Sequence, residues 1–408
     1  MTLGVIAFVV ALLVSIMLHE AGHFATAKRF GMKAPQFFVG FGPTIWSFRR
    51  GETEYGIKAI PAGGFVKITG MTPLEEVEPG DEDRAFYKQP AWQRTIVLAA
   101  GSFMHFVIAF ALLFAVLAVI GTPKLVPTVN TVSACVPAKL TTQPTAQVCS
   151  ALPPSPAKAA GLQHGDEIVA FDGQPIKDWD ALTAKLQKHG PGPVTLTIVR
   201  DGQRSVRTVD LVPAERPSET DPKVMQTVGA LGVTATEVAD RMDPLAAVAH
   251  AGTGFGRLTT ATFGALGNLP HAVGNLFHAT VDGGQRSSDG LVGPVGIARV
   301  SGEALAQGGT PLFDRIGTFV LLIAGVNVFV GIFNLLPLLP LDGGHLAVLG
   351  YEEGRRRLYR LVGRRDPGRV DLTKLLPAAY LVMVLFIGLS VLLLLGDIVN
   401  PIANPFTG

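Results

Sequence analysis

The chain has 408 residues and a formal charge of +2 at pH 7; 48% of its residues are hydrophobic and only 16% are charged. Soluble proteins usually carry about 25% charged residues, so this composition is typical of a membrane protein that also has soluble parts. The small net charge gives no reason to expect nucleic acid or an acidic macromolecule as a partner.

The first hydrophobic segment, residues 3–27, is long enough to cross a bilayer, yet it contains three ionisable residues. They form the pattern His-Glu-x-x-His at His19, Glu20 and His23, which is the signature of zinc proteases. On a helix the two histidines lie one turn apart and can bind one metal ion, and Glu20 could take a proton from a water on that metal. Ionisable groups at membrane depth are costly and usually functional. No basic region precedes the segment, so we expect a retained span rather than a cleaved signal peptide.

Three further segments are apolar and long enough to span a membrane: 95–120, 316–341 and 375–398. Basic residues follow the first span, precede the second and fill the loop between the third and fourth. By the positive-inside rule these loops are cytoplasmic, and both termini lie outside. The long insertion between spans two and three then also lies outside.

That insertion contains Cys135 and Cys149, and their positions argue against a zinc site built on thiolates. The spacing leaves open whether they form a disulfide or remain two free thiols.

The first cytoplasmic loop is expected to contain a β-hairpin. Residues 52–68 alternate in polarity, and Pro61 to Gly64 read as the turn. Just before them, Gly40-Phe41-Gly42 forms a loop whose glycines permit close backbone approach.

A small α+β domain is predicted over residues 155–212 of the insertion. It has a helical stretch at 179–188 and two strands at 194–200 and 205–211, joined by an Asp201-Gly202 turn. The segment before it and residues 213–222 look like linkers, and 243–280 look like a helix on the membrane surface. The predicted parts of the chain are 1–121, 122–154, 155–212, 213–312 and 313–408.

A catalytic zinc site usually has three protein ligands and one open position, so two histidines are not enough. Asp342 directly follows the third span and lies at the same end of the membrane as the two histidines. His345 and His105 are the alternatives for the third ligand.

These features together resemble a known family, the site-2 proteases, which are intramembrane zinc metalloproteases. The closest branch is the bacterial one that cleaves membrane-bound anti-sigma factors. The resemblance covers nearly the whole chain. Besides the features above it rests on Gly293-Pro294-Val295-Gly296-Ile297 and on Leu341-Asp342-Gly343. It implies a polytopic α-helical membrane protein with four transmembrane helices, a re-entrant β-hairpin on the cytoplasmic side and one extracytoplasmic α+β PDZ-like domain.

The resemblance also implies roles for individual residues. His19, His23 and Asp342 would hold Zn²⁺, and Glu20 would be the general base. Asn334 would contact the substrate backbone or the oxyanion, and the hairpin would offer a strand edge to the substrate. His105 departs from the family, which usually has Gly-Pro-x-x-Asn where this chain has Gly101-Ser102-Phe103-Met104-His105. The implied substrate contacts are Asn334, His105, Gly63, Gly64 and Phe65.

The expected partners are single-span membrane proteins, membrane lipid, and a peptide or substrate ectodomain at the PDZ-like domain. That domain could bind peptides by strand addition or act as a size filter. The expected location is the bacterial cytoplasmic membrane. Two other functions stay open: a metal transporter that uses the same three ligands, and a receptor or scaffold with an inactive site.

Overall fold

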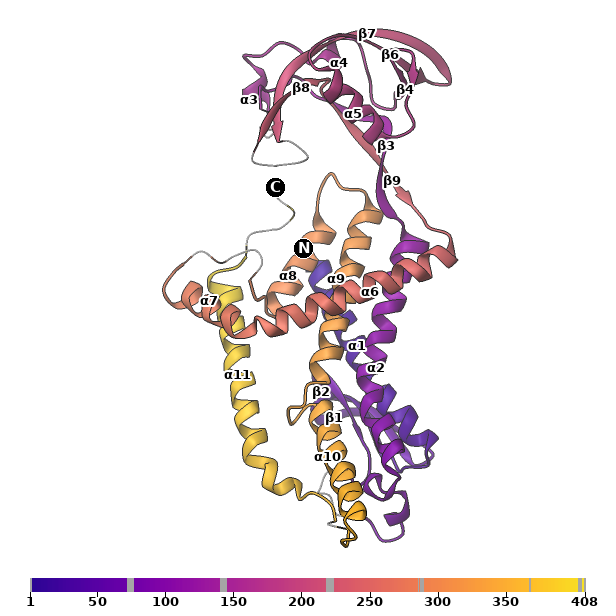
Figure 1. Ribbon diagram of the computed structural model, residues 1–408, viewed down its shortest axis with the longest axis vertical. Helices are drawn as coiled ribbons and strands as arrows, with labels where there is room; N and C mark the ends of the chain where they lie inside the picture. The colour runs from indigo at the N-terminus through magenta and orange to yellow at the C-terminus, as the bar shows by residue number, and fades with distance from the viewer. Residues whose placement is uncertain are drawn as a thin grey trace. The chain divides into compact units, whose positions relative to one another are not determined.

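The computed structural model describes residues 2–71, 77–139, 145–217, 224–284, 286, 290–366, 368–402 and 406 (Figure 1). Contacts divide the chain into two compact units. One consists of Met1–Gly121 and Arg241–Gly408, and we call it the membrane unit. The other is Thr122–Asp240, the insertion unit.

Within the described residues, four helical stretches are long and apolar enough to cross a membrane. They are Thr2–Arg29, Ala91–Ile120, Leu312–Asn334 and Thr373–Val399. The first is α1. The second is α2 (Ala91–Ala115), continued by a π-helical turn, η3 (Val116–Ile120). The third is α9 (Leu312–Asn334), and the fourth joins η4 (Leu372–Leu375) to α11 (Leu376–Val399). The four predicted spans are therefore confirmed.

The third span is shorter than predicted, because α9 ends at Asn334 rather than at 341. Pro337 and Pro340 have no backbone N–H to donate, so the apolar run 335–341 cannot continue the helix. The chain turns there and starts a new helix, α10 (Asp342–Leu361). The basic segment after the third span, predicted as a loop, is thus largely helical.

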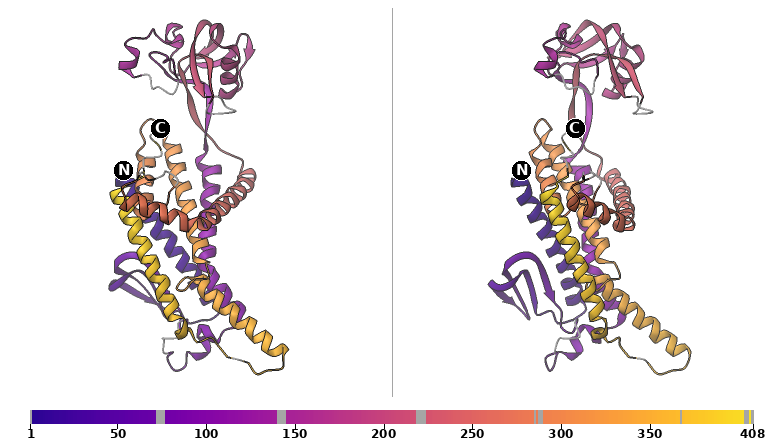
Figure 2. Two further views of the ribbon diagram at one scale, coloured as in Figure 1. Left: turned by 60° about the vertical axis from the view of Figure 1, so that its left-hand side comes forward. Right: turned by 90° about the vertical axis from the view of Figure 1, so that its left-hand side faces the viewer.

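The core of the membrane unit is formed where α1, α2 and α9 pack together, with α8 (Pro294–Ala306) against α1 (Figure 2). The helices α1 and α2 approach closely at Gly22, where an added Cβ would lie 2.6 Å from the carbonyl oxygen of Ala100. A glycine inside the His-Glu-x-x-His motif therefore lets this part of α1 pack directly against α2.

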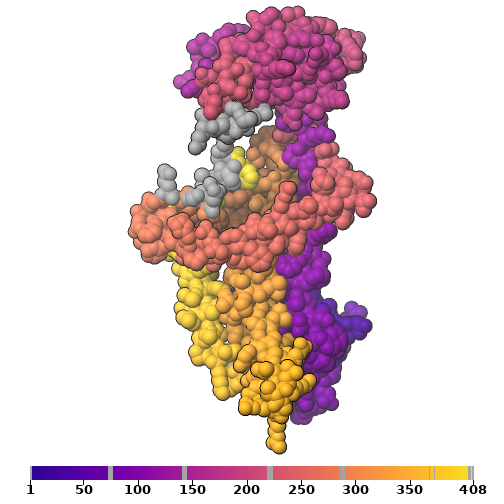
Figure 3. Space-filling view, viewed as in Figure 1, coloured from indigo at the N-terminus to yellow at the C-terminus, as the bar shows by residue number. Residues whose placement is uncertain are grey.

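Two helices cross this bundle. They are α6 (Pro244–Gly267) and α7 (Leu269–Val281), which form a band over α2, α9 and α11 (Figure 3). Asp243 caps α6 by accepting a hydrogen bond from the N–H of Leu245. The helix predicted over 243–280 is present as two helices that meet at Asn268.

The end of α11 is joined to Arg286 by a buried ion pair, and to α7 and α8 by hydrogen bonds. The carboxylate of Asp397 accepts hydrogen bonds from Arg286 (2.9 Å) and from the N–H groups of Gly293 (3.3 Å) and Gly296 (2.7 Å). The side chain of Asn400 donates to the carbonyl oxygens of Ala279 and Gly284. One end of α11 is thereby anchored to the first turn of α8.

The two β-strands of the membrane unit, β1 (Gln36–Arg50) and β2 (Thr53–Lys67), form a sheet of their own. The tight turn is at Gly51 and Glu52, where Gly51 has φ of +63°. Residues 36–39 lie between 54–57 and 64–67, which both pair with them. Two short 3₁₀ helices, η1 (Glu82–Arg84) and η2 (Phe86–Lys88), follow before α2.

The predicted hairpin was therefore misplaced. Residues 61–64 do not form its turn; they lie inside β2, where the strand crosses from one side of 36–39 to the other. Pro61 and Gly63 bend the strand at this point, and Gly63 has φ of +134°, which favours glycine.

The insertion unit contains one antiparallel sheet with helices packed on it. The strands are β3 (Thr122–Val132), β4 (Glu167–Phe171), β5 (Gln174–Pro175), β6 (Gly192–Arg200), β7 (Gln203–Pro217), β8 (Met225–Ala230) and β9 (Val233–Asp240). Their order is β8-β7-β6-β4-β3-β9, with β5 beside β4. The helices are α3 (Ala146–Cys149), α4 (Pro156–Ala159) and α5 (Trp179–His189). Its core includes fully buried Ile168, Leu182, Leu196 and Ile198.

The Asp201-Gly202 turn is confirmed, with φ of +49° and +78° between β6 and β7. The described parts of the two predicted linkers, 122–139, 145–154 and 213–217, instead belong to this unit: β3 pairs with β9, and β7 continues to Pro217 and pairs with β8. Residues 140–144 and 218–222 of these linkers lie outside the described residues. Prolines at 123 and 127 suggested a linker, but Val129 of the same segment is completely buried in the core. Cys135 and Cys149 form a disulfide, which settles the alternative that spacing left open.

Candidate metal and catalytic site

Three side chains from two distant parts of the membrane unit meet at one point. His19 and His23 extend from α1, and Asp342 is the first residue of α10. Asp342 Oδ2 lies 3.4 Å from His19 Nε2 and 3.3 Å from His23 Nε2, and the two Nε2 atoms are 3.2 Å apart. Ligand atoms placed 2.0–2.1 Å from a tetrahedral zinc ion would be about 3.3–3.4 Å apart. The three atoms thus have the spacing of a zinc ligand set.

The surroundings of these atoms also fit a metal site. His19 and His23 are 8% and 4% exposed, and Asp342 Oδ2 is buried without a hydrogen-bond partner among the described residues. His23 Nδ1–H donates to the carbonyl oxygen of Val97 at 2.7 Å, which leaves the Nε2 lone pair for a metal. Burial would raise the pKa of Asp342, but His23 and His19 hold it below its ordinary value. The carboxylate is therefore ionised, as metal ligation requires.

Gly101 of α2 closes the site on the side facing the histidines. A Cβ at this position would lie 2.3 Å from His23 Nε2 and 2.5 Å from His19 Cε1. No side chain fits there, so the backbone of α2 packs directly against the two imidazole rings.

Glu20 lies beside the ligand set and is held by the hairpin. Its Oε2 accepts a hydrogen bond of 3.0 Å from the backbone N–H of Val66 in β2. The carboxylate next to the first histidine is thus oriented by the strand 64–67.

The matches to known proteins agree with this geometry. Residues 7–364 match the model of peptidase family M50. The chain is 40% identical to the zinc metalloprotease Rip1 of Mycobacterium tuberculosis and 38% identical to Rip1 of Mycolicibacterium smegmatis. Each alignment covers 98% of both chains.

The chain belongs to peptidase family M50. Its relatives are named zinc metalloproteases, so the predicted family, the enzyme class and the Zn²⁺ cofactor are confirmed. This M50 protease is a multi-pass membrane protein with four apolar helices among its described residues. The alternatives of a metal transporter or an inactive scaffold gain no support from these relatives.

His105 of the M50 protease lies next to the ligand set but is not part of it. Its ring centroid is 5.0 Å from that of His19, and its Nδ1–H donates to Asn327 Oδ1 at 2.8 Å. The amide of Asn327 donates in turn to Ser15 Oγ (3.1 Å) and to the carbonyl oxygen of Ile323 (2.9 Å). This buried chain of hydrogen bonds joins α2, α9 and α1 directly behind His19.

Asn327 is a residue that the sequence analysis missed. It is 1% exposed in the middle of an apolar span. A lone amide at that depth is itself a signal, because helices in membranes use such groups to hydrogen-bond each other.

The other predicted site residues are not part of the group of three candidate ligands. Asn334 ends α9 and has no side-chain hydrogen bond within the described residues. His345, one turn along α10, is not in the group of three ligands. Gly64 lies close to α1, since a Cβ there would be 2.4 Å from Met17 Sδ. The ring of Phe65 stacks on Phe38 at 5.7 Å.

Proposed function

We propose that this M50 protease hydrolyses peptide bonds within or near the transmembrane segments of single-span membrane proteins. His19, His23 and Asp342 would hold the zinc ion. One observation carries the proposal: the three ligand atoms converge at the end of α1, an apolar helix, rather than in the insertion unit. Peptide bonds that reach this site must come from segments at or near the membrane.

Zinc, when bound by these residues, supplies Lewis acidity that activates a water molecule and polarises the scissile carbonyl. Glu20 accepts the proton of the attacking water and later donates a proton to the leaving amine. The hydrogen bond from the N–H of Val66 keeps one of its oxygens in place for this exchange. The hydrogen-bonded chain from His105 through Asn327 to Ser15 would fix the ring of His105, which lies 5.0 Å from the ring of His19.

A transmembrane helix pairs all its backbone groups internally, so a substrate must unwind before a carbonyl can reach the site. The strand 64–67 is suited to receive the unwound segment. In the described structure it pairs with 36–39 on one side, and the N–H of Val66 is directed to Glu20 on the other. A peptide added along Gly63, Gly64 and Phe65 would therefore lie beside the base. Asn334, the last residue of α9, would contact the same segment.

The hairpin also has features of a re-entrant element. Its side chains include strongly exposed Ile45 (70%), Trp46 (56%) and Ile60 (55%). Large apolar side chains that are exposed beside membrane-spanning helices indicate contact with lipid. We place the hairpin and the active site near the cytoplasmic side, where the basic residues of the short loops cluster.

The insertion unit is then extracytoplasmic, which its disulfide supports. It resembles a PDZ domain and has a groove of about 650 Å³ lined by Trp179 and Leu186 of α5 and by Leu231 and Gly232. We propose that this groove receives a peptide or ectodomain of the substrate, so that the unit controls which substrates approach. Anti-sigma factors and remnant signal peptides are the expected substrate classes.

The test is cleavage of single-span reporter proteins in proteoliposomes by the full-length enzyme and by Glu20→Gln. The variant should retain one zinc per chain by elemental analysis but cleave about 10²–10⁴-fold more slowly, because the base is lost. Glu167→Gln, at an exposed carboxylate of the insertion unit, serves as the matched control and should cleave normally.

Mass spectrometry of the products locates the cut. Unchanged cleavage by Glu20→Gln would exclude Glu20 as the base. Cuts confined to soluble loops far from the reporter's span would be consistent with a zinc protease, but they would refute the intramembrane mechanism.

A further inference from the structure

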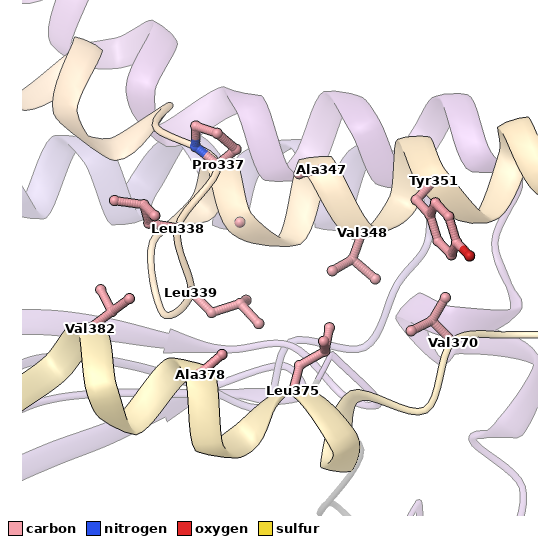
Figure 4. Close-up of a pocket in the computed structure, with 11 residues that line it drawn as sticks. Pro337, Leu338, Leu339, Ala347, Val348, Tyr351, Val370, Leu375, Ala378 and Val382 are labelled. Atoms are coloured by element: carbon pink, nitrogen blue, oxygen red, sulfur yellow. The ribbon is translucent and has the colours of Figure 1, made fainter.

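A cavity in the membrane unit is separate from the candidate metal site. It has a volume of about 400 Å³ and lies between α10, the start of α11 and the loop after α9. Ala347, Val348 and Tyr351 line it from α10, and Leu375, Ala378 and Val382 from the other side (Figure 4). Apart from the hydroxyl of Tyr351 at its rim, these side chains are apolar.

The cavity lies on the face of α10 that is turned away from the metal. Successive residues of an α-helix are about 100° apart, so Asp342 and Tyr351, nine positions apart, lie on opposite faces. Leu349, close in angle to Asp342, is 5% exposed and packs into the bundle. A substrate peptide in this cavity would be separated from Asp342 by the helix itself. Its occupant can therefore affect the site only indirectly, through α10 and through the loop 337–339 that leads into Asp342.

The surroundings of the cavity suit the acyl chain of a lipid. None of the most apolar 18-residue window of α11 is buried in the protein, so this helix faces lipid. Leu358 and Val362 extend the cavity face of α10 and are 58% and 59% exposed. An apolar cavity that opens toward acyl chains is filled at low cost by one of them.

The rim of the cavity has a cation without a carboxylate partner in the described structure. Arg355 lies one turn after Tyr351 on the same face, 5.6 Å from its ring. It donates one hydrogen bond, of 2.9 Å, to the carbonyl oxygen of Gly368, and its Nε is buried without a partner among the described residues. The neighbouring Arg356 is instead paired with Glu353 and Asp366. A phosphate oxygen is a suitable acceptor for a guanidinium that has no carboxylate partner.

We propose that this place binds one anionic phospholipid, with an acyl chain in the cavity and the phosphate at Arg355. The bound lipid holds α10 against α11, and α10 begins with the metal ligand Asp342. Lys374, which is exposed directly before Leu375, adds a second positive charge near the rim.

The test is native mass spectrometry of the full-length protein in detergent with added phosphatidylglycerol or phosphatidylcholine. The wild type should retain one phosphatidylglycerol and release phosphatidylcholine. Arg355→Gln should weaken retention about fivefold or more, since one basic group near an anionic headgroup is lost. The matched control is Arg357→Gln, an exposed arginine about 200° away around α10, which should bind as the wild type does.

A second measurement is made on the wild type, so it does not depend on how a variant folds. Phosphatidylglycerol with a photoreactive group on its acyl chain should crosslink in the wild type to the cavity residues of α10 and α11. Ala347→Trp, which fills the cavity, should abolish that crosslink while keeping its zinc.

Equal weakening by Arg355→Gln and Arg357→Gln would refute the site in favour of diffuse charge attraction. Equal retention of phosphatidylcholine would refute the role of the phosphate. Crosslinks elsewhere, or displacement of the lipid by a substrate segment that crosslinks in the cavity, would also overturn the proposal. Lipid binding is read without cleavage, so these results are independent of the proposed substrate class.

Discussion

Gly101 determines how closely α2 can approach the metal ligands. The space that a side chain would need is occupied by the rings of His19 and His23. The glycine looks unremarkable in the sequence, because one glycine in an apolar span has many possible reasons. Only the packing of α1 on α2 shows that this position admits no Cβ.

Replacing Gly101 by Ala should therefore displace the imidazoles, although alanine favours a helix. We expect zinc to fall well below one ion per chain, with a loss of cleavage of at least about tenfold, as for disturbed metal surroundings. Elemental analysis and the reporter assay measure both. Gly325→Ala in α9, where a Cβ meets nothing within 4 Å, should keep its zinc. Full metal content in Gly101→Ala would contradict the steric argument.

The residues of the site differ in how well the sequence predicted them. His19, Glu20 and His23 form one local motif, so helix geometry alone puts them together. Asp342 came from the resemblance and from its position after a span, with His345 and His105 as alternatives. Asn327 was missed because its partners, His105 and Ser15, are on other helices. The roles of Asn334, Gly63, Gly64 and Phe65 stay predictions.

At the scale of elements, the hairpin is fastened to the membrane helices by a charged group at its turn. The carboxylate of Glu52 accepts hydrogen bonds from Arg84 at 2.7 and 2.8 Å and also pairs with Lys28 at the end of α1. Hydrogen bonds from Arg84, with a further contribution from Lys28, lower the pKa of Glu52 from 4.5 to about 2. The turn is thus held between α1 and the 3₁₀ helix η1.

This attachment should depend on pH. Because the pKa of Glu52 is lower in the folded state, its contribution is fully present above about pH 4.5 and is lost as the pH falls toward 2. Hydrogen exchange of the turn amides, corrected for the intrinsic rate, should show protection falling over that range. Glu52→Gln should reduce protection already at pH 7 and remove the dependence, whereas Glu167→Gln should change neither. Protection in the wild type that stays constant from pH 5 to 2.5 would contradict this account.

Periodicity located the elements better than it located their ends. All four spans were found because each is a long apolar run. The hairpin turn was placed at Pro61–Gly64 because proline and glycine mark turns. The chain turns at Gly51 instead, and Pro61 and Gly63 bend β2 so that it pairs with both sides of residues 36–39. Both Gly51 and the segment Pro61–Gly64 contain glycine. Which of the two forms the tight turn depends on the pairing of residues that are distant in the sequence.

At the scale of the whole molecule, the chain builds two units with separate cores. The insertion unit has its own buried cluster, and its disulfide closes a loop between residues 14 positions apart. Cys135 is 1% exposed and lies in the segment that enters that unit. The crosslink therefore stabilises the insertion unit, and the three candidate zinc ligands belong to the other unit.

Replacing both cysteines by serine should lower the free energy of unfolding of the insertion unit by about 3 kcal/mol, the value expected for a loop of this length. Hydrogen exchange of its core strands should show the loss, while the zinc content of the membrane unit stays unchanged. Ser150→Ala, beside Cys149, controls for a change in the same segment. Loss of zinc together with the disulfide would show that the two units are not independent.

The sequence by itself determined the membrane class, the four spans, the zinc motif and the resemblance to the family, because these depend on composition and short-range periodicity. The tertiary structure brought Asp342, more than three hundred residues from His19, into one group with His19 and His23 that could hold a metal ion. It also decided the hairpin's register, the disulfide and the partner of His105. Each of these is a contact between segments far apart in the chain, and only the packing of the folded helices and strands brings such segments together.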